Sequence, residues 1–329
     1  MDMLRSHRRA LDETSRWSFI VGAPRCGTTS LSRYLKDHPE VCFSRVKEPH
    51  FFSQNDLCQL DDDELNAVVR KRYLEGYFPE PDHSSLRAEA SVTYLYTPER
   101  MKPVLRLWPR AKFVISVRNP LELIPSLHQR LIHNGDETVR DLRRAWDLVP
   151  ERRAGRSIPR RCADPRWLDY WEAGQLGKHV QKFVSLVGRE RCFISVFDDF
   201  SADPASEYRR LLDFLELDDD GRTNYATHRQ SFDVRIAWLQ RILKRPPRTL
   251  VSVLANDSYR QRLNAAKPPK VVQETALSLR KRLLRWNRVP ACKPRLDEQL
   301  RAEMRLMYRD DVALLSEIVG RDLSHWVAS

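Results

Sequence analysis

WSFIVGAPRCGTTSLSRYL, residues 17–35, joins a short apolar segment, a glycine-bounded loop and the start of a helical pattern. Residues 17–21 are largely aromatic or β-branched and stop at Gly22, which is typical of a buried strand. Apolar side chains with helical spacing follow the loop, and the His38-Pro39 pair predicts the end of that helix. We therefore expect a strand, a loop and a helix in this order.

The same succession recurs at two later places. Residues 112–117 (KFVISV) are followed by a helical pattern in which Pro125 is expected to distort or delay the first turns. Residues 192–197 (CFISVF) form a third strand candidate between helical patterns at 170–186 and 205–217. Strands that alternate with helices predict an α/β fold, a parallel sheet flanked by helices. In such sheets ligands bind beyond the carboxyl ends of the strands.

The chain has 329 residues, 41% hydrophobic and 31% charged, which is enough apolar material for a core and too much for a disordered chain. We expect a single domain over residues 1–329, with an α/β core at 17–217 and a helical C-terminal region at 218–329. Residues 134–166, rich in Arg and Pro, are expected to form a long insertion or lid without regular structure.

Neither a membrane span nor a metal site is evident in the sequence. No stretch approaches 18 uncharged apolar residues, and the charged residues 1–16 do not resemble a secretory signal. The six cysteines lie far apart without a C-x-x-C pair, so we expect no zinc ribbon, disulfide framework or bound metal. We expect a cytoplasmic protein, and we leave open a peripheral contact with a membrane.

The net charge of +12 is concentrated in one basic segment, residues 241–293. This segment holds 14 Lys or Arg and two acids, whereas the rest of the chain is balanced. Apolar residues between 271 and 286 alternate with Arg and Lys, a pattern that suits an anionic membrane or an acidic glycan. The pattern is equally typical of a helix packed on the core with its arginines outside.

The loop GAPRCGTT, Gly22–Thr29, has the features of a phosphate-binding loop. A glycine-bounded loop between a strand and a helix directs backbone N–H groups and the helix dipole towards an anion. It is not a Walker A loop, because Thr28 rather than Lys follows Gly27. Thr-Thr-Ser at a helix start is also ordinary N-capping chemistry, so a turn without a ligand is the simpler alternative.

A cysteine phosphatase, a kinase and a nucleic-acid-binding protein are the competing functions. The phosphatase motif C-x5-R does not fit, since six residues separate Cys26 from Arg33. A P-loop-type kinase of a small metabolite needs a Walker lysine and a carboxylate at a strand end, where this chain has Arg118 and Asn119. Nucleic-acid binding would rest on the basic segment, which has no recognised module.

Residues 19–41 (FIVGAPRCGTTSLSRYLKDHPEV) and 47–52 (KEPHFF) resemble the opening of sulfotransferases that use 3'-phosphoadenosine-5'-phosphosulfate (PAPS). The similarity is to the heparan-sulfate-type, carbohydrate branch and its bacterial relatives. It continues through EASVTYLY (89–96) and VRNPLELIPS (117–126) and is weakest across 134–166 and the basic segment. It implies a P-loop-like fold and transfer of a sulfuryl group to an acceptor hydroxyl, with release of adenosine 3',5'-bisphosphate.

The resemblance also implies which residues bind PAPS. The loop after the first strand would hold the 5'-phosphosulfate, through Arg25, Cys26, Gly27, Thr28, Thr29 and Ser30. Arg118 and Ser126, eight residues apart, would hold the 3'-phosphate. A later loop within 227–235 would contact the adenosine through Arg235, for which an exposed arginine at a helix start is the competing interpretation, or through Arg229.

Sulfuryl transfer needs a base for the hydroxyl proton and cations for the developing charge, and in principle it needs no metal. Glu48 aligns with the family's catalytic glutamate and is the expected base, with a surface salt bridge as its alternative. Lys47 should lower the pKa of Glu48 unless burial opposes this effect. His50 is either an alternative base or a packed neighbour. Arg25 and Lys47 are expected to stabilise the sulfuryl and bridging oxygens.

One departure from the family pattern concerns residue 90. Heparan-type enzymes carry a Lys after the Glu of this later motif, where the chain has Ala90, so Lys47 is a candidate to replace that cation. Ser91 and Thr93 either contact the acceptor or form a polar strand end. The resemblance favours an acceptor hydroxyl on a carbohydrate, a glycolipid or a glycosylated metabolite.

Overall fold

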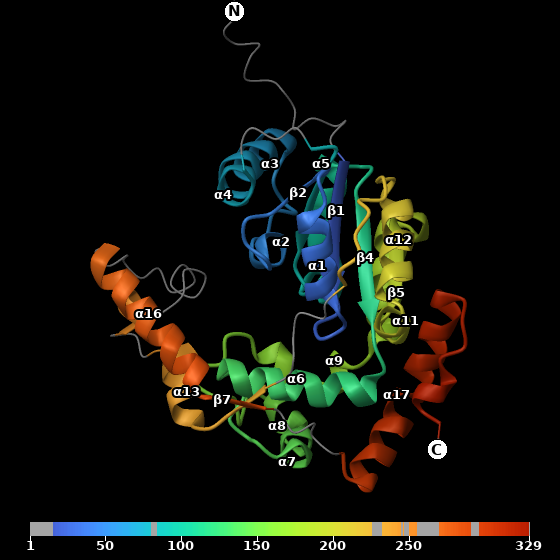
Figure 1. The fold of residues 1–329 in the computed structure, drawn as a ribbon. Helices are drawn as coiled ribbons and strands as arrows, with labels where there is room; N and C mark the ends of the chain where they lie inside the picture. The colour runs from blue at the N-terminus through green and yellow to red at the C-terminus, as the bar shows by residue number, and fades with distance from the viewer. Residues whose placement is uncertain are drawn as a thin grey trace, which may run out of the picture. The chain divides into compact units, whose positions relative to one another are not determined.

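Five parallel strands form the central sheet of the described residues, two more than the three strands that the sequence predicts (Figure 1). The computed structural model describes residues 16–79, 84–225, 232–244, 246, 250–254, 270–290 and 296–328. Within them the strand order is β2-β3-β1-β4-β5, and every neighbouring pair is parallel. The strands are β1 (Arg16–Gly22), β2 (Val41–Phe43), β3 (Leu86–Ala90), β4 (Lys112–Val117) and β5 (Cys192–Val196). The parallel sheet flanked by helices is confirmed.

The chain divides into two compact units, and the sheet belongs to the first. The described parts of 1–119, 176–229 and 311–325 form this unit. Its helices are α1 (Thr28–Asp37), α2 (Phe51–Gln54), α3 (Asp62–Val68), the π-helix η2 (Val69–Leu74), α4 (Glu75–Tyr77), η3 (Tyr94–Tyr96), η4 (Pro98–Met101), α5 (Lys102–Leu107), α10 (Leu176–Val187), η6 (Arg189–Arg191), α11 (Phe197–Ala202) and α12 (Pro204–Leu215). Helix α17 (Glu298–Val319) and the short η8 (Ser324–Trp326) cross the boundary between the units.

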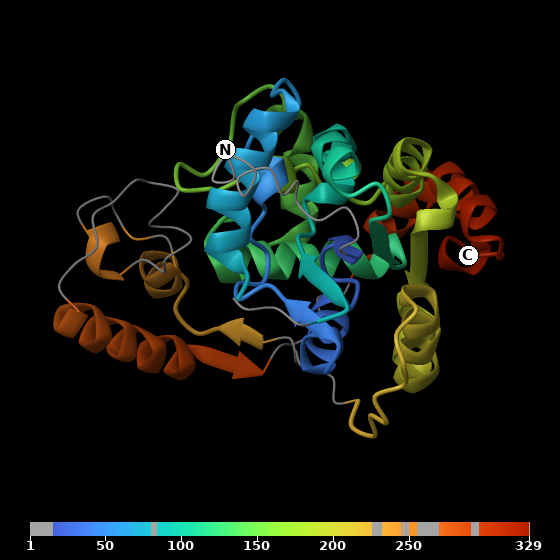
Figure 2. The ribbon, with the colours of Figure 1, turned by 90° about the horizontal axis from the view of Figure 1, so that it is seen from above.

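The second unit is mainly helical. Its elements are α6 (Pro120–Asn134), α7 (Leu142–Asp147), α8 (Val149–Arg153), η5 (Pro165–Leu168), α9 (Tyr170–Ala173), β6 (Phe232–Val234), α13 (Ala237–Lys244), α14 (Val251–Leu254), α16 (Lys270–Trp286) and β7 (Arg288–Pro290). Helix α16 leads into β7, which pairs antiparallel with β6 (Figure 2). This strand pair was not predicted, because the sequence after residue 218 shows only helical patterns. The boundary at residue 217 between core and C-terminal region stays a prediction.

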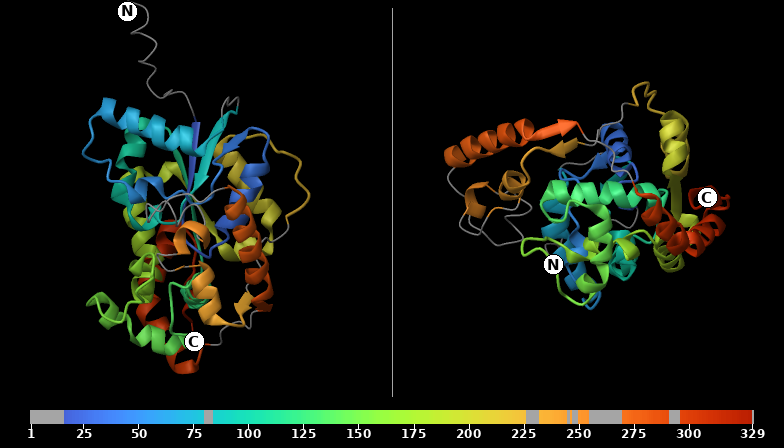
Figure 3. Two further views of the ribbon diagram at one scale, coloured as in Figure 1. Left: turned by 90° about the vertical axis from the view of Figure 1, so that its left-hand side faces the viewer. Right: turned by 90° about the horizontal axis from the view of Figure 1, so that it is seen from below.

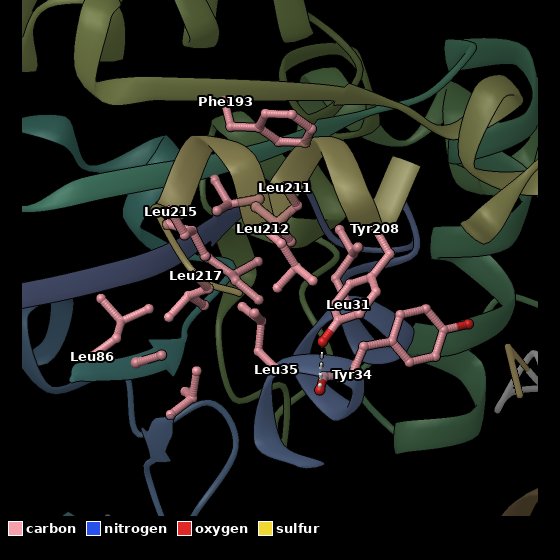
Figure 4. Packing of buried hydrophobic residues seen from close by; sticks show 14 of the residues in the cluster. Leu31, Tyr34, Leu35, Leu86, Phe193, Tyr208, Leu211, Leu212, Leu215 and Leu217 are labelled. Carbon is pink, nitrogen blue, oxygen red and sulfur yellow. Dashed lines mark hydrogen bonds between the residues drawn. The ribbon is translucent and has the colours of Figure 1, made fainter. Parts of the chain in front are cut away.

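Alternation along β1 supplies both faces of the sheet with apolar side chains. Ile20 and Val114 belong to the core on the face that α1 and α12 cover. Phe193 of β5 packs in the same core, over Leu211 and Leu212 of α12 (Figure 4). On that face the Tyr208 hydroxyl donates to the Tyr34 carbonyl oxygen, 3.4 Å away. The helical residues of this core are Leu31, Tyr34, Leu35, Phe200, Tyr208, Leu211, Leu212 and Leu215.

The opposite face carries an aromatic cluster. Trp17 of β1 stacks on Trp108 with ring centroids 4.0 Å apart, and Phe19 lies 6.3 Å from Phe52 of α2. Tyr73 of η2 joins them, 6.0 Å from Trp17 and 5.0 Å from Phe52. Because this face is almost wholly apolar, any carboxyl placed in it loses most of its hydration.

Two helix predictions need correction. Helix α6 begins at Pro120 and contains Pro125, so the expected delay of its first turns is wrong. Proline suits the first helical position, where its N–H would lack an acceptor in any case. The pattern at 170–186 forms two helices that separate at Gly174, where the Tyr308 side chain occupies the space a Cβ would need.

Residues 134–166 are not a structureless insertion, since they contain α7 and α8. Between these helices and α6 lies a buried ion pair, with Glu137 Oε2 2.8 Å from Arg152 Nη1. The hydroxyl of Tyr170 donates to the same carboxylate oxygen at 2.8 Å. The segment therefore has a polar centre of its own inside the second unit.

Candidate functional site

The loop between β1 and α1 has the backbone of an anion-binding turn. Arg25 and Gly27 adopt left-handed conformations, with φ of 66° and 85°, and Gly27 caps α1. A Cβ on Gly27 would lie 3.1 Å from the Phe200 ring, so both the conformation and the packing favour glycine. The first N–H groups of α1 have no acceptor within the helix, and the helix dipole adds positive potential there. This end of α1 suits a phosphate or sulfate group.

Arg118, directly after β4, reaches the same loop. Its Nη1 donates to the carbonyl oxygen of Arg25 at 3.1 Å, and its guanidinium lies 4.3 Å from the centroid of the Phe197 ring. Two parallel strands therefore bring Arg25 and Arg118 together at the carboxyl edge of the sheet, as the sequence predicts for a ligand site.

Cys26 faces the interior beneath this loop. Burial raises the pKa of its thiol to about 12, although Arg118 and Arg25 act in the opposite direction. A thiol with this pKa is not ionised near neutral pH and is a poor nucleophile. The chemistry of the side chain thus agrees with the spacing argument against a cysteine phosphatase.

The segment Lys47–His50 is fastened to the end of β3. The Glu48 N–H donates to the carbonyl oxygen of Ala90 at 2.8 Å, and the His50 N–H donates to the Ser91 hydroxyl at 2.9 Å. Because β3 pairs with β1, this Lys47–His50 loop lies at the same edge of the sheet as the loop that carries Arg25.

The Glu48 carboxylate lies between two cationic or titratable side chains. One oxygen forms an ion pair with Lys47 Nζ, and the other is 3.8 Å from His50 Nε2. The Glu48 side chain is 32% exposed, so a substrate can approach it. His50 is a hydrogen-bonded neighbour, since its Nδ1 lies 2.9 Å from the Thr93 hydroxyl, which itself contacts Ser53 at 2.7 Å.

Strained backbone conformations are concentrated at the candidate site residues that the sequence predicts. Five described residues other than glycine have a left-handed backbone, and three of them are Arg25, Glu48 and His50. Such conformations cost of order 1–3 kcal/mol each and are common at active sites. The strain therefore agrees with a functional role for both loops.

Glu89 is a residue that the sequence analysis did not select for the site. It lies on β3 with no exposed surface, among the aromatic side chains that cover this face. Burial raises its pKa to about 8, and the nearby hydroxyls of Tyr94, Tyr73 and Ser91 oppose this effect only in part. The sequence does contain a signal for Glu89, because it is a charged residue in an otherwise buried β pattern and lies two positions before Ser91, a candidate contact of the acceptor.

Ser126 and Arg235 belong to the second unit. Ser126 lies on α6, and Arg235 follows β6 with its guanidinium 5.7 Å from the centroid of the Trp286 ring. Their contacts with the nucleotide stay predictions. Arg229 lies outside the described residues.

The described residues contain neither a metal-binding cluster nor a membrane-spanning helix. No group of three His, Cys, Asp or Glu side chains is arranged to hold a metal ion. No helix in this part of the chain has both the length and the apolar character needed to cross a membrane.

The chain is similar in sequence to known sulfotransferases. Human carbohydrate sulfotransferase 15 is 53% identical over 36 residues, which is 11% of this chain and 6% of that protein. Human bifunctional heparan sulfate N-deacetylase/N-sulfotransferase 2 is 29% identical over 178 residues, 48% of this chain and 19% of that protein. The chain thus matches only a small part of the length of these relatives.

A solved structure of a sulfotransferase from Alicyclobacillus acidocaldarius shares the fold. It has a TM-score of 0.61 at 23% identity, and the match covers 94% of this chain and 98% of that one. The sequence pattern of the sulfotransferase family matches residues 18–221, which include both candidate loops and Arg118. The chain therefore belongs to the sulfotransferase family.

Proposed function

We propose that the protein transfers the sulfuryl group of PAPS to an acceptor hydroxyl, with Glu48 as the general base. The observation that carries the proposal is the meeting of the Gly22–Thr29 loop, Arg118 and the Lys47–His50 loop at one edge of the sheet. Membership of the sulfotransferase family supports sulfuryl transfer, and the resemblance of the loops to phosphate-binding motifs supports PAPS as the donor.

In this reaction the acceptor oxygen bonds to sulfur while the bond between sulfur and the phosphate oxygen breaks in line. Glu48 takes the hydroxyl proton, and adenosine 3',5'-bisphosphate leaves. Arg25 and the N–H groups at the start of α1 stabilise the charge on the sulfuryl and leaving oxygens. His50 is the alternative base, although its hydrogen bonds to Ser91 and Thr93 favour a supporting role.

Lys47 is proposed to supply the cation that the family carries at position 90. Glu48, the next residue, is hydrogen-bonded through its backbone to Ala90. The Lys47 ammonium group is therefore held near the strand end from which the family's lysine would extend. Its present partner is the Glu48 carboxylate, and we propose that it turns to the sulfuryl oxygens in the complex with PAPS.

The acceptor is proposed to be a hydroxyl of a carbohydrate, a glycolipid or a glycosylated metabolite. The names of the matched relatives, which include carbohydrate and heparan sulfate sulfotransferases, support this class. Mass spectrometry of extracts incubated with the protein and isotopically labelled PAPS identifies the acceptor as a labelled sulfate ester. A resin that carries adenosine 3',5'-bisphosphate distinguishes a sulfotransferase from a P-loop-type kinase. A sulfotransferase should bind this resin and be eluted by adenosine 3',5'-bisphosphate but not by ATP, whereas a kinase would bind ATP.

Replacing Arg118 with alanine is expected to weaken the binding of adenosine 3',5'-bisphosphate about 10- to 100-fold, the range for a lost hydrogen bond to a charged group. Isothermal titration calorimetry measures this change directly. Arg110→Ala, an exposed arginine before the other end of β4, is the matched control and should bind as the wild type does. Equal affinity of the Arg118 variant and this control would remove Arg118 from the nucleotide site.

We further propose that the second unit docks on an anionic membrane through α13 and α16 (Figure 3). Trp238 on α13 and Leu279 and Trp286 on α16 are exposed by 64%, 56% and 53%. Leu279 and Trp286 are two turns apart and share a face of α16 with the exposed Arg282. Exposed tryptophan beside basic side chains suits a membrane interface, whereas an acidic glycan needs only the charges.

Sedimentation with vesicles that contain anionic lipid tests this surface. Lys281→Ser with Arg282→Ser should reduce binding, and Trp286→Ala should reduce it as well. Arg70→Ser with Lys71→Ser, exposed residues of a second Arg-Lys-Arg run, is the matched control. Binding unchanged by about 0.5 M salt would exclude electrostatic docking, because the Debye length is then only a few ångströms. Binding that depends on the charges but not on Trp286 would favour an acidic glycan.

A further inference from the structure

Glu89, whose carboxyl is fully buried, directly precedes Ala90 and Ser91, to which the Lys47–His50 loop is hydrogen-bonded. Neither of its oxygens makes a hydrogen bond of normal geometry with the described residues. The hydroxyls of Tyr94, Tyr73 and Ser91 are nevertheless close enough to influence it. A fully buried carboxyl in an aromatic face is costly for the fold, and this cost suggests a function.

Two of the hydroxyls that neighbour Glu89, those of Ser91 and Tyr94, also hold the start of α2. The Ser91 hydroxyl accepts from the N–H of His50 at 2.9 Å, and the Tyr94 hydroxyl accepts from the N–H of Phe52 at 3.4 Å. These N–H groups follow Glu48 by two and four residues. The orientation of both hydroxyls thus affects the backbone on which the proposed base is carried.

We propose that Glu89 is a positioning residue, which fixes the hydroxyls of Ser91 and Tyr94 and through them the Lys47–His50 loop. A neutral carboxyl both donates and accepts a hydrogen bond, so it can satisfy two hydroxyls that are already accepting from the backbone. This inference rests on the proposed sulfuryl transfer for its catalytic consequence, but its effect on the loop can be measured separately.

The side chains around Glu89 determine how costly its ionisation is. The titratable side chains that face it are Tyr73 on η2, Tyr77 on α4 and Tyr94 on η3, and none of them is cationic. Arg87, two positions earlier on β3, lies over the Trp17 ring instead. No described cation therefore compensates a charge on Glu89.

The direction of the pH effect follows from the raised pKa. An ordinary glutamate ionises near pH 4.5, whereas Glu89 in the folded protein stays neutral until the pH rises through about 8. Ionisation then places an uncompensated charge among aromatic rings and removes the proton that the carboxyl donates. The loop should be well ordered below this pKa and looser above it.

Hydrogen exchange of residues 47–54 in the full chain, on both sides of this pKa, tests the proposal without any substrate. After correction for intrinsic exchange, the wild type should lose protection as the pH rises through the pKa. Glu89→Gln, which keeps a donor and an acceptor but cannot ionise, should keep its protection at both pH values. Ser91→Ala should lower protection throughout, because it removes the acceptor of the His50 N–H, whereas Glu75→Gln on the surface of α4 should not.

Turnover of PAPS with an identified acceptor supplies the second measurement. Glu89→Ala should lower kcat about tenfold or more, as displacement of a catalytic group does, with little change in KM for PAPS. Glu89→Gln should restore kcat and abolish its alkaline decline. Wild-type protection in Glu89→Ala, or the same alkaline loss in Glu89→Gln, would overturn the proposal. If the wild type sulfates no acceptor, the proposed function fails, and hydrogen exchange alone decides the role of Glu89.

Discussion

Glu48→Gln is expected to lower kcat for sulfuryl transfer by about 10²- to 10⁴-fold, the usual contribution of a general base. Glutamine fills the same space and can still meet Lys47, but it cannot take the hydroxyl proton. Affinity for adenosine 3',5'-bisphosphate should be unchanged, because the arginines proposed to bind it follow β1, β4 and β6 and lie outside the Lys47–His50 loop. The measurement is the rate at which labelled sulfate ester forms from PAPS, together with calorimetric binding of the nucleotide.

Glu75→Gln on the surface of α4 is the matched control for this change and should leave both quantities unaltered. A Glu48 variant that turns over at the wild-type rate would contradict the assignment of the base. His50→Ala then becomes the decisive variant, since His50 Nε2 lies 3.8 Å from Glu48 and is the remaining candidate.

Arg152→Met is expected to lower the free energy of unfolding by about 3–5 kcal/mol, because it leaves a buried carboxylate without its cation. The side chains of Arg152 and Glu137 are only 2% and 0% exposed. Glu137 Oε1 also accepts from the N–H groups of residues 138 and 139, at 2.7 and 2.9 Å, so the carboxylate cannot simply move to water. Urea denaturation measures the loss as a lower midpoint.

The adjacent arginine provides the control for this prediction. Arg153 pairs with Asp169, but its side chain is 46% exposed, and Arg153→Met should change stability by less than about 1 kcal/mol. Glu137→Gln in the Arg152→Met background should recover part of the loss, because glutamine keeps acceptors without a charge. Equal midpoints for the two arginine variants would show that the buried pair does not stabilise the second unit.

Local sequence order was sufficient to predict a parallel sheet, three of its five strands and the edge at which a ligand is expected. The segment 17–35 contains a strand, a glycine-bounded loop and a helix in one continuous run, and residues 112–118 repeat the strand and its polar end. Parallel pairing of β1 and β4 then brings Arg25 and Arg118 to the same edge. Hydrophobic periodicity and turn residues predict these elements because both depend on residues only a few positions apart.

Contacts between distant residues were beyond the reach of such patterns. Glu48 and His50 are held by hydrogen bonds to Ala90 and Ser91, some forty positions later in the chain. Both residues have a left-handed backbone, but neither is a glycine, so the sequence does not indicate this conformation. Residues 134–166 were expected to lack structure because their Arg and Pro content hides the pairing of Glu137 with Arg152. The strands β6 and β7 are three residues each, too short for a period to show.

By itself, then, the sequence predicted three strands of the parallel sheet, the loops and helices that follow them, and the Gly22–Thr29 loop as a candidate anion-binding site. Only the tertiary structure decided that Glu89 is fully buried beside the residues that hold the Lys47–His50 loop, where burial raises its pKa to about 8. The physical reason is desolvation, which depends on every element that covers a side chain. The spacing of residues along β3 assigns Glu89 to a face of the sheet, but the rings of η2 and η3 exclude water from it.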